Sequence, residues 1–86
     1  MKLTHEGKEL LTEWGHKEEN FNQIERATTK TTYEMNGNKI SANKALEILG
    51  RETYLSGISR SAFHWSACRD NGKGQTVYFD SSKLFK

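Results

Sequence analysis

Apolar residues recur at helical spacing at the start of the chain and predict a first helix. Four of them share one face: Leu3, Leu10, Leu11 and Trp14. Thr4 stands before this face as an N-cap, and Gly15 ends it as a C-cap. A second helix is predicted over residues 18–27, where Phe21 and Ile24 fall on one side. The connection is very short, so we expect the two helices to form a helical hairpin.

The pattern then changes to that of extended chain. Residues 28–35 contain a run of threonines and a tyrosine, which favours a strand. Asn36-Gly37 follows, a strong signal for a tight hairpin turn, and residues 38–40 return as a second strand. Ser41 then caps a third helix over residues 42–49.

Residues 51–67 allow two interpretations. Leu55, Ile58, Ala62 and Trp65 fit one helical face, which favours a single long helix to about residue 67. A glycine in the middle of a helix costs about 1 kcal/mol, so a break at Ser56-Gly57 is equally compatible with the pattern.

The last part of the chain predicts a loop and a strand. Residues 70–74 are polar and glycine-rich, and residues 75–80 alternate as a strand does. Val77 and Phe79 face one side, and Thr76 and Tyr78 the other. Residues 81–85 then form a turn that docks Leu84 and Phe85 on the core.

This order of elements predicts an α+β fold. An N-terminal helical hairpin and further helices would pack on a small antiparallel sheet. With 86 residues, the chain (residues 1–86) forms one small domain around one core.

Cysteine usage and hydropathy indicate a compartment. The lone Cys68 excludes an intramolecular disulfide and a multi-cysteine zinc site, and a free thiol suits a reducing environment. The N-terminus lacks the apolar core of a signal peptide, and no segment has the length of a membrane span. We therefore expect a cytoplasmic protein with no membrane partner.

Charge is unevenly distributed. Residues 1–40 carry six basic and seven acidic side chains, whereas residues 41–86 carry seven basic and four acidic ones. The basic excess therefore lies in the half that contains residues 58–69, the segment richest in candidate chemistry.

Catalysis and metal binding find little support in the chain. On a helix, His64 and Cys68 would share a face and could form a nucleophilic pair, but no third group is near to orient them. The loop at residues 70–74 matches neither the phosphate-loop nor the dinucleotide fingerprint. We predict no enzymatic activity, no cofactor and no metal site.

Residues 58–69 combine side chains that contact DNA phosphates and base edges. Ser59, Arg60, Ser61 and His64 would act from a helix. Three further cations lie nearby in the sequence: Arg51, Arg69 and Lys73.

From Ser41 onward the chain resembles the small winged-helix domains of phage excisionases and mercury-resistance-type regulators. Residues 42–50 resemble their first helix, residues 59–65 their recognition helix, and residues 77–84 the end of their wing. The resemblance implies that Ser59, Arg60, Ser61 and His64 approach the major groove, with Arg69 and Lys73 serving the wing. The chain departs from the pattern where residues 51–57 stand between the two helices.

The sequence thus favours a non-enzymatic accessory or regulatory protein of a mobile element that binds DNA weakly. The alternative is a protein-interaction module, a small inhibitor or assembly factor, that binds a partner or a second copy through Tyr54, Phe63, Trp65 and Arg60. Exposure distinguishes the two. Buried aromatics under exposed arginines favour DNA, whereas exposed aromatics in a contiguous apolar patch favour a protein partner or a homodimer.

Overall fold

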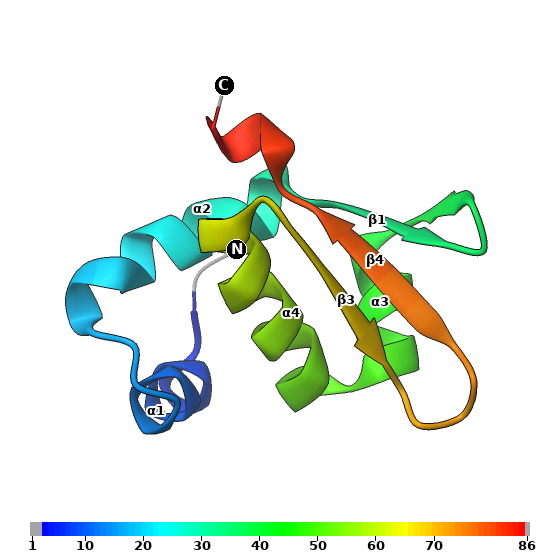
Figure 1. Cartoon of the computed structure of the whole chain (residues 1–86). Helices are drawn as coiled ribbons and strands as arrows, with labels where there is room; N and C mark the ends of the chain where they lie inside the picture. Colours follow the sequence, from blue (N-terminus) through cyan, green and yellow to red (C-terminus); the bar gives the residue numbers. More distant parts are fainter. Residues whose placement is uncertain (1–2, 86) are drawn as a thin grey trace.

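In the computed structural model of the chain, which describes residues 3–85, four α-helices pack against a four-stranded antiparallel sheet (Figure 1). The α+β class predicted from the sequence is confirmed. The elements in chain order are α1 (His5–Glu13), η1 (Glu18–Asn20), α2 (Phe21–Lys30), β1 (Thr32–Met35), β2 (Asn38–Ile40), α3 (Ala42–Leu49), α4 (Arg51–His64), β3 (Ser66–Asp70), β4 (Thr76–Asp80) and η2 (Ser82–Phe85).

The strands lie in the order β2-β1-β4-β3, and every neighbouring pair is antiparallel. Val77 and Phe79 of β4 are buried under the helices, while Thr76 and Tyr78 are exposed on the other face, as the alternation predicts. β3 forms one edge of the sheet, and its middle residue Cys68 pairs with Tyr78 on the exposed face.

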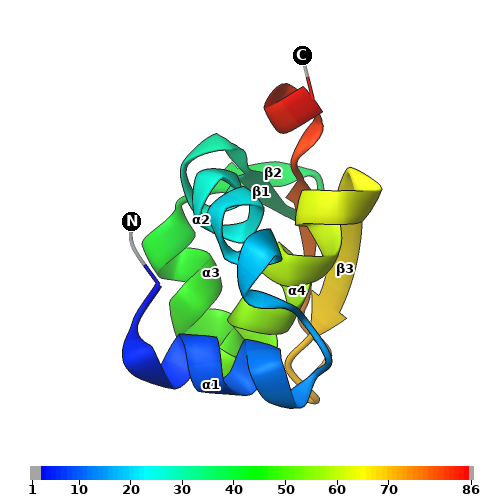
Figure 2. The same ribbon diagram turned by 90° about the vertical axis from the view of Figure 1, so that its left-hand side faces the viewer.

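Helix α4 is the centre of the molecule. It contacts α1, α2 and α3, and it also packs on β3 and β4 (Figures 1 and 2). Its sequence explains this position, because buried residues occur on every turn rather than on one stripe: Tyr54, Leu55, Gly57, Ile58, Ser59, Ser61 and Ala62. Both α1 and α2 therefore pack on α4.

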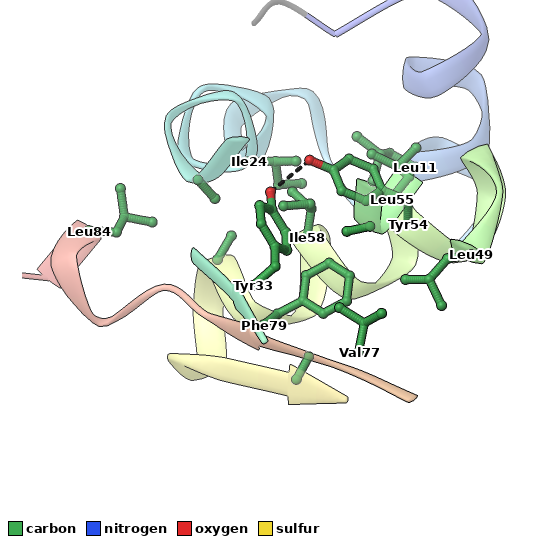
Figure 3. Packing of buried hydrophobic residues seen from close by; sticks show 14 residues of the cluster. Leu11, Ile24, Tyr33, Leu49, Tyr54, Leu55, Ile58, Val77, Phe79 and Leu84 are labelled. Carbon is green, nitrogen blue, oxygen red and sulfur yellow. Dashed lines mark hydrogen bonds between the residues drawn. The ribbon is translucent and has the colours of Figure 1, made fainter. Parts of the chain in front are cut away.

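Three aromatic rings meet where α4 crosses the sheet (Figure 3). Phe79 lies with its ring centre 5.3 Å from that of Tyr33 and 5.9 Å from that of Tyr54. The two tyrosine hydroxyls share a hydrogen bond of 2.7 Å within the core. Burial raises the pKa of both tyrosines, so both hydroxyls are protonated at neutral pH. Each hydroxyl is the hydrogen-bond partner of the other.

We expect Tyr54→Phe to lower the free energy of unfolding by about 1–2 kcal/mol, because the buried Tyr33 hydroxyl would lose its partner. Replacing both tyrosines with phenylalanine should restore most of this loss, since no polar atom is then left unpaired. Urea denaturation of the two single variants and the double variant measures the coupling. If the losses of stability in the two single variants add up in the double variant, the predicted coupling between Tyr33 and Tyr54 is wrong.

The predicted caps and turns are confirmed. The Thr4 side chain accepts a hydrogen bond from the Gly7 N–H (3.0 Å) at the start of α1, and Ser41 does the same for Lys44 (3.1 Å) in α3. In the β1–β2 turn, Asn36 and Gly37 have φ values of 55° and 80°, as a tight hairpin requires.

The strand predicted from residue 28 begins later than expected, at Thr32, because α2 continues to Lys30. The hydroxyls of Thr28 and Thr29 donate to the carbonyls of Glu25 (2.6 Å) and Arg26 (3.0 Å) one turn earlier. These bonds accommodate β-branched residues in a helix end, so local strand propensity is overridden.

Residues 51–64 form one unbroken helix, which decides between the two interpretations of this segment. The helix ends earlier than residue 67, however, because Trp65 adopts a φ of 72° and reverses the chain. Residues 66–70 instead form β3 alongside β4, a strand that was not predicted between the helix and the loop at residues 70–74. The ladder with β4 outweighs the helical pattern, which had counted Trp65 as a core position.

Candidate functional site

The structure separates the seven residues predicted to contact DNA into three groups. Arg51, at the start of α4, is exposed and pairs with Glu6 of α1 at 3.3 Å. Lys73 lies on the β3–β4 loop, beside Lys44 and Glu47 of α3. Neither belongs to the group formed by the other arginines.

The two serines have little or no exposed surface, which disagrees with their predicted role. Ser61 has no exposed surface, donates to the Ile58 carbonyl (3.2 Å), and accepts a hydrogen bond from the Ser81 hydroxyl (2.7 Å). Ser81 also bonds to the hydroxyl of Thr31, so this chain of hydroxyls ties α2, α4 and the end of β4 together. Ser59 is almost buried, and its hydroxyl donates to the Ser56 carbonyl (3.0 Å). Neither hydroxyl is free to contact a phosphate.

The remaining three residues, Arg60, His64 and Arg69, line one groove. It has a volume of about 280 Å³ and lies between α4, β3 and the connection that follows α1. Three aromatic or imidazole rings share its lining, namely Trp14, His16 and Phe63, and Ser56 and Ser59 complete it. Figure 2 shows the connection rising from the end of α1 beside α4.

Phe63 and Trp65 are exposed, although Trp65 fits the apolar helical face of Leu55, Ile58 and Ala62 in the sequence. The reason is that α4 directs Ile58 and Ala62 into the core, which places Phe63 outside, and Trp65 stands on the chain reversal. Their exposed fractions are 38% and 59%. Phe63 stacks with His16 (6.2 Å between ring centres, 22° between planes).

Two further aromatic residues of this surface were missed by the sequence analysis. Trp14 was counted on the apolar face of the first helix, and Phe85 was expected to dock on the core, yet both are more than one third exposed. Leu84 docks as predicted, whereas Phe85 stacks on Trp65, with ring centres 5.4 Å apart and planes at 12°. The sequence carried no signal for this pairing, because 20 positions separate the two rings.

His64 and Cys68 do not form the helical pair considered from their spacing. His64 ends α4, whereas Cys68 lies on β3, so the four-residue interval spans the reversal at Trp65. Within residues 3–85, no three His, Cys, Asp or Glu side chains gather as metal ligands would.

The glycine-rich loop has a structural explanation of its own. The Asn71 side-chain oxygen accepts hydrogen bonds from the backbone N–H groups of Lys73 (2.8 Å) and Gln75 (3.2 Å). Asn71 also donates to the Gln75 side chain (2.7 Å). Two N–H groups that would have to face a phosphate are therefore engaged in holding the turn.

Neither the family models, nor the curated proteins, nor the solved structures contain a match to this chain. Among the described residues, no helix combines the length and the apolar character needed to cross a membrane.

Proposed function

We propose that this protein is a protein-interaction module that binds its partner through the surface around the C-terminal end of α4. Two pairs of large aromatic side chains lie near this end, each residue more than one third exposed: Trp14 and Phe63 line one groove, and Trp65 stacks on Phe85. This exposure is the observation that carries the proposal. Small domains need their aromatic residues for the core, and aromatic side chains beside arginine are the commonest anchors of protein interfaces.

The backbone at Trp65 supports the same proposal. A φ of 72° is uncommon for a residue other than glycine and destabilises the fold slightly. The conformation is held by a hydrogen bond of 2.7 Å from the Ser81 N–H to the Trp65 carbonyl. It places a tryptophan on the surface where glycine would serve the turn better, which is typical of a residue kept for contact with a ligand.

The surroundings of α4 favour a protein partner over duplex DNA. A recognition helix must expose one face along its length to enter the major groove. Here α1 contacts the first half of α4, through Glu6 with Arg51 and Gly7 beside Leu55, while His16 stacks on Phe63 in the second half. The net charge of +2 is also small for a protein that binds phosphates mainly by charge.

Phe63→Ala is expected to reduce the amount of partner retained by the immobilised protein by about tenfold or more, as loss of a central anchor does. Tyr78→Thr is the matched control, because Tyr78 is equally exposed (40%) but lies on the opposite face of the sheet. The measurement is affinity capture from a lysate of the organism that encodes the chain, with quantitative mass spectrometry of the retained proteins.

Equal retention by the wild type and Phe63→Ala would contradict the proposal. Sedimentation velocity of both proteins tests whether the partner is a second copy, in which case Phe63→Ala converts a dimer to a monomer. An NMR titration with duplex DNA at low salt addresses the alternative function. Chemical-shift changes at Arg51, Arg60 and Lys73, without any protein retained, would favour DNA binding instead.

A further inference from the structure

The charged side chains that line the groove beside α4 are all basic. Its eight lining residues include two arginines and two histidines, and none of them is acidic. Acidic side chains are otherwise common in the chain, which has eleven. The groove is therefore a local site of positive potential on a molecule that is nearly neutral as a whole.

The two arginines differ in how they are held. Arg69 is fixed by three hydrogen bonds: Nε donates to the Ser56 hydroxyl (2.9 Å), Nη2 to the Ser56 carbonyl (3.4 Å), and Nη1 to the Cys68 carbonyl (2.8 Å). A guanidinium carries five N–H donors, so two of those on Arg69 have no partner among residues 3–85.

Arg60 is exposed, and it forms no ion pair or hydrogen bond within residues 3–85. Its charge is thus uncompensated, and its side chain stands at the groove that Arg69 already lines. A fixed guanidinium and an unpaired one that line the same groove suit recognition of a carboxylate, because planar N–H pairs match the two carboxylate oxygens.

Two large aromatic side chains supply the apolar part of the lining. Trp14 and Phe63 border the groove, and His16 stacks on Phe63. A volume of about 280 Å³ lies at the lower end of the range for ligand pockets, so it accommodates one or two side chains of a peptide.

We propose that this groove binds an acidic segment of the partner protein, with a carboxylate against Arg60 and Arg69 and a neighbouring apolar side chain against Trp14 and Phe63. This inference rests on the proposed interaction function and specifies the chemistry of the partner. The two arginines attract an acidic residue of the partner by charge, and the exposed rings offer an apolar surface for its neighbour.

Selection of a randomised peptide library on the immobilised protein tests the proposal. We expect the selected peptides to be enriched in Asp or Glu next to an aromatic or large aliphatic residue. A peptide from this pool should bind Arg60→Gln about tenfold more weakly than it binds the wild type, because a charge-assisted hydrogen bond is lost.

Arg51→Gln is the matched control for this substitution. Arg51 and Arg60 are both exposed on α4, and both substitutions remove one positive charge, but Arg51 lies outside the groove. We expect Arg51→Gln to bind the peptide within about twofold of the wild type, since a distant exposed charge is largely screened. NMR spectra of the labelled protein should show peptide-induced shifts at Trp14, His16 and Arg69.

The possible results distinguish the acidic-segment proposal from the more general interaction function. If selected peptides lack acidic enrichment and bind Arg60→Gln normally but lose binding to Phe63→Ala, the acidic class is overturned and the interaction function stands. If no peptide sequence is enriched, the groove proposal is overturned. If single-stranded oligothymidine shifts the groove resonances while no acidic peptide is selected, the groove is a nucleic-acid site, and both proposals fail.

Discussion

Gly57→Ala is expected to lower the free energy of unfolding by about 2–3 kcal/mol, although alanine is the better helix former. Gly57 lies in the middle of α4, where a Cβ would stand 2.7 Å from the Cε1 and Cε2 atoms of Phe79 and closer still to Cζ. The Phe79 ring cannot swing aside, since it is fully buried between Tyr33 and Tyr54. Thermal and urea denaturation followed by circular dichroism measure the loss.

Gly7→Ala provides the control for this prediction. Gly7 is also buried in a helix, but its Cβ would lie 3.3 Å from the Thr4 hydroxyl and 3.6 Å from Leu55, which a small shift accommodates. We expect a change within about 0.5 kcal/mol, because the gain in helix propensity offsets the closer contact. Phe79→Leu should partly rescue Gly57→Ala, since it removes the ring tip. Equal stability of Gly57→Ala and wild type would contradict the close approach.

Leu11→Ala should also destabilise the protein strongly, by about 2–4 kcal/mol. Leu11 is fully buried and is the main apolar side chain through which α1 reaches the core. A chain of 86 residues has a total stability of about 4–13 kcal/mol, so this loss is a large fraction of the total. Because Trp14 and His16 follow α1, the same change should disturb the groove.

Hydrogen exchange measures this effect element by element. In Leu11→Ala, the amides of α1 should lose protection first, while those of α4 open only with global unfolding. Leu10→Ala is the control, because Leu10 is only partly buried and its truncation should cost about 1 kcal/mol. Unchanged protection of α1 in Leu11→Ala would show that other contacts hold this helix.

Features that depend on neighbouring residues were predictable from the sequence. The caps at Thr4 and Ser41, the turn at Asn36-Gly37 and the inward direction of Val77 and Phe79 all follow from local hydrogen bonding, backbone sterics or the strand period. These preferences involve only a few neighbouring residues, so the local sequence is enough to predict them.

The end of α4 was not predictable in this way. Trp65 fits the helical face of Leu55, Ile58 and Ala62, and only the ladder between β3 and β4 favours leaving the helix at that point. Gly57 is a similar case. Its cost to the helix is visible in the sequence, but its benefit arises from Phe79, which is 22 positions away.

The candidate site also combines features that the local sequence predicts with features that depend on tertiary packing. Residue types and spacing were enough to name Arg60, His64 and Arg69 as candidates, and periodicity was enough to predict the α+β class. Tertiary packing was needed to show that Ser61 is buried and Ser59 nearly so, that Arg51 and Lys73 lie elsewhere, and that Trp14, His16 and Phe63 meet at one groove. The physical reason is that exposure depends on contacts between distant segments, above all those that surround α4 on several sides, and no local pattern records them.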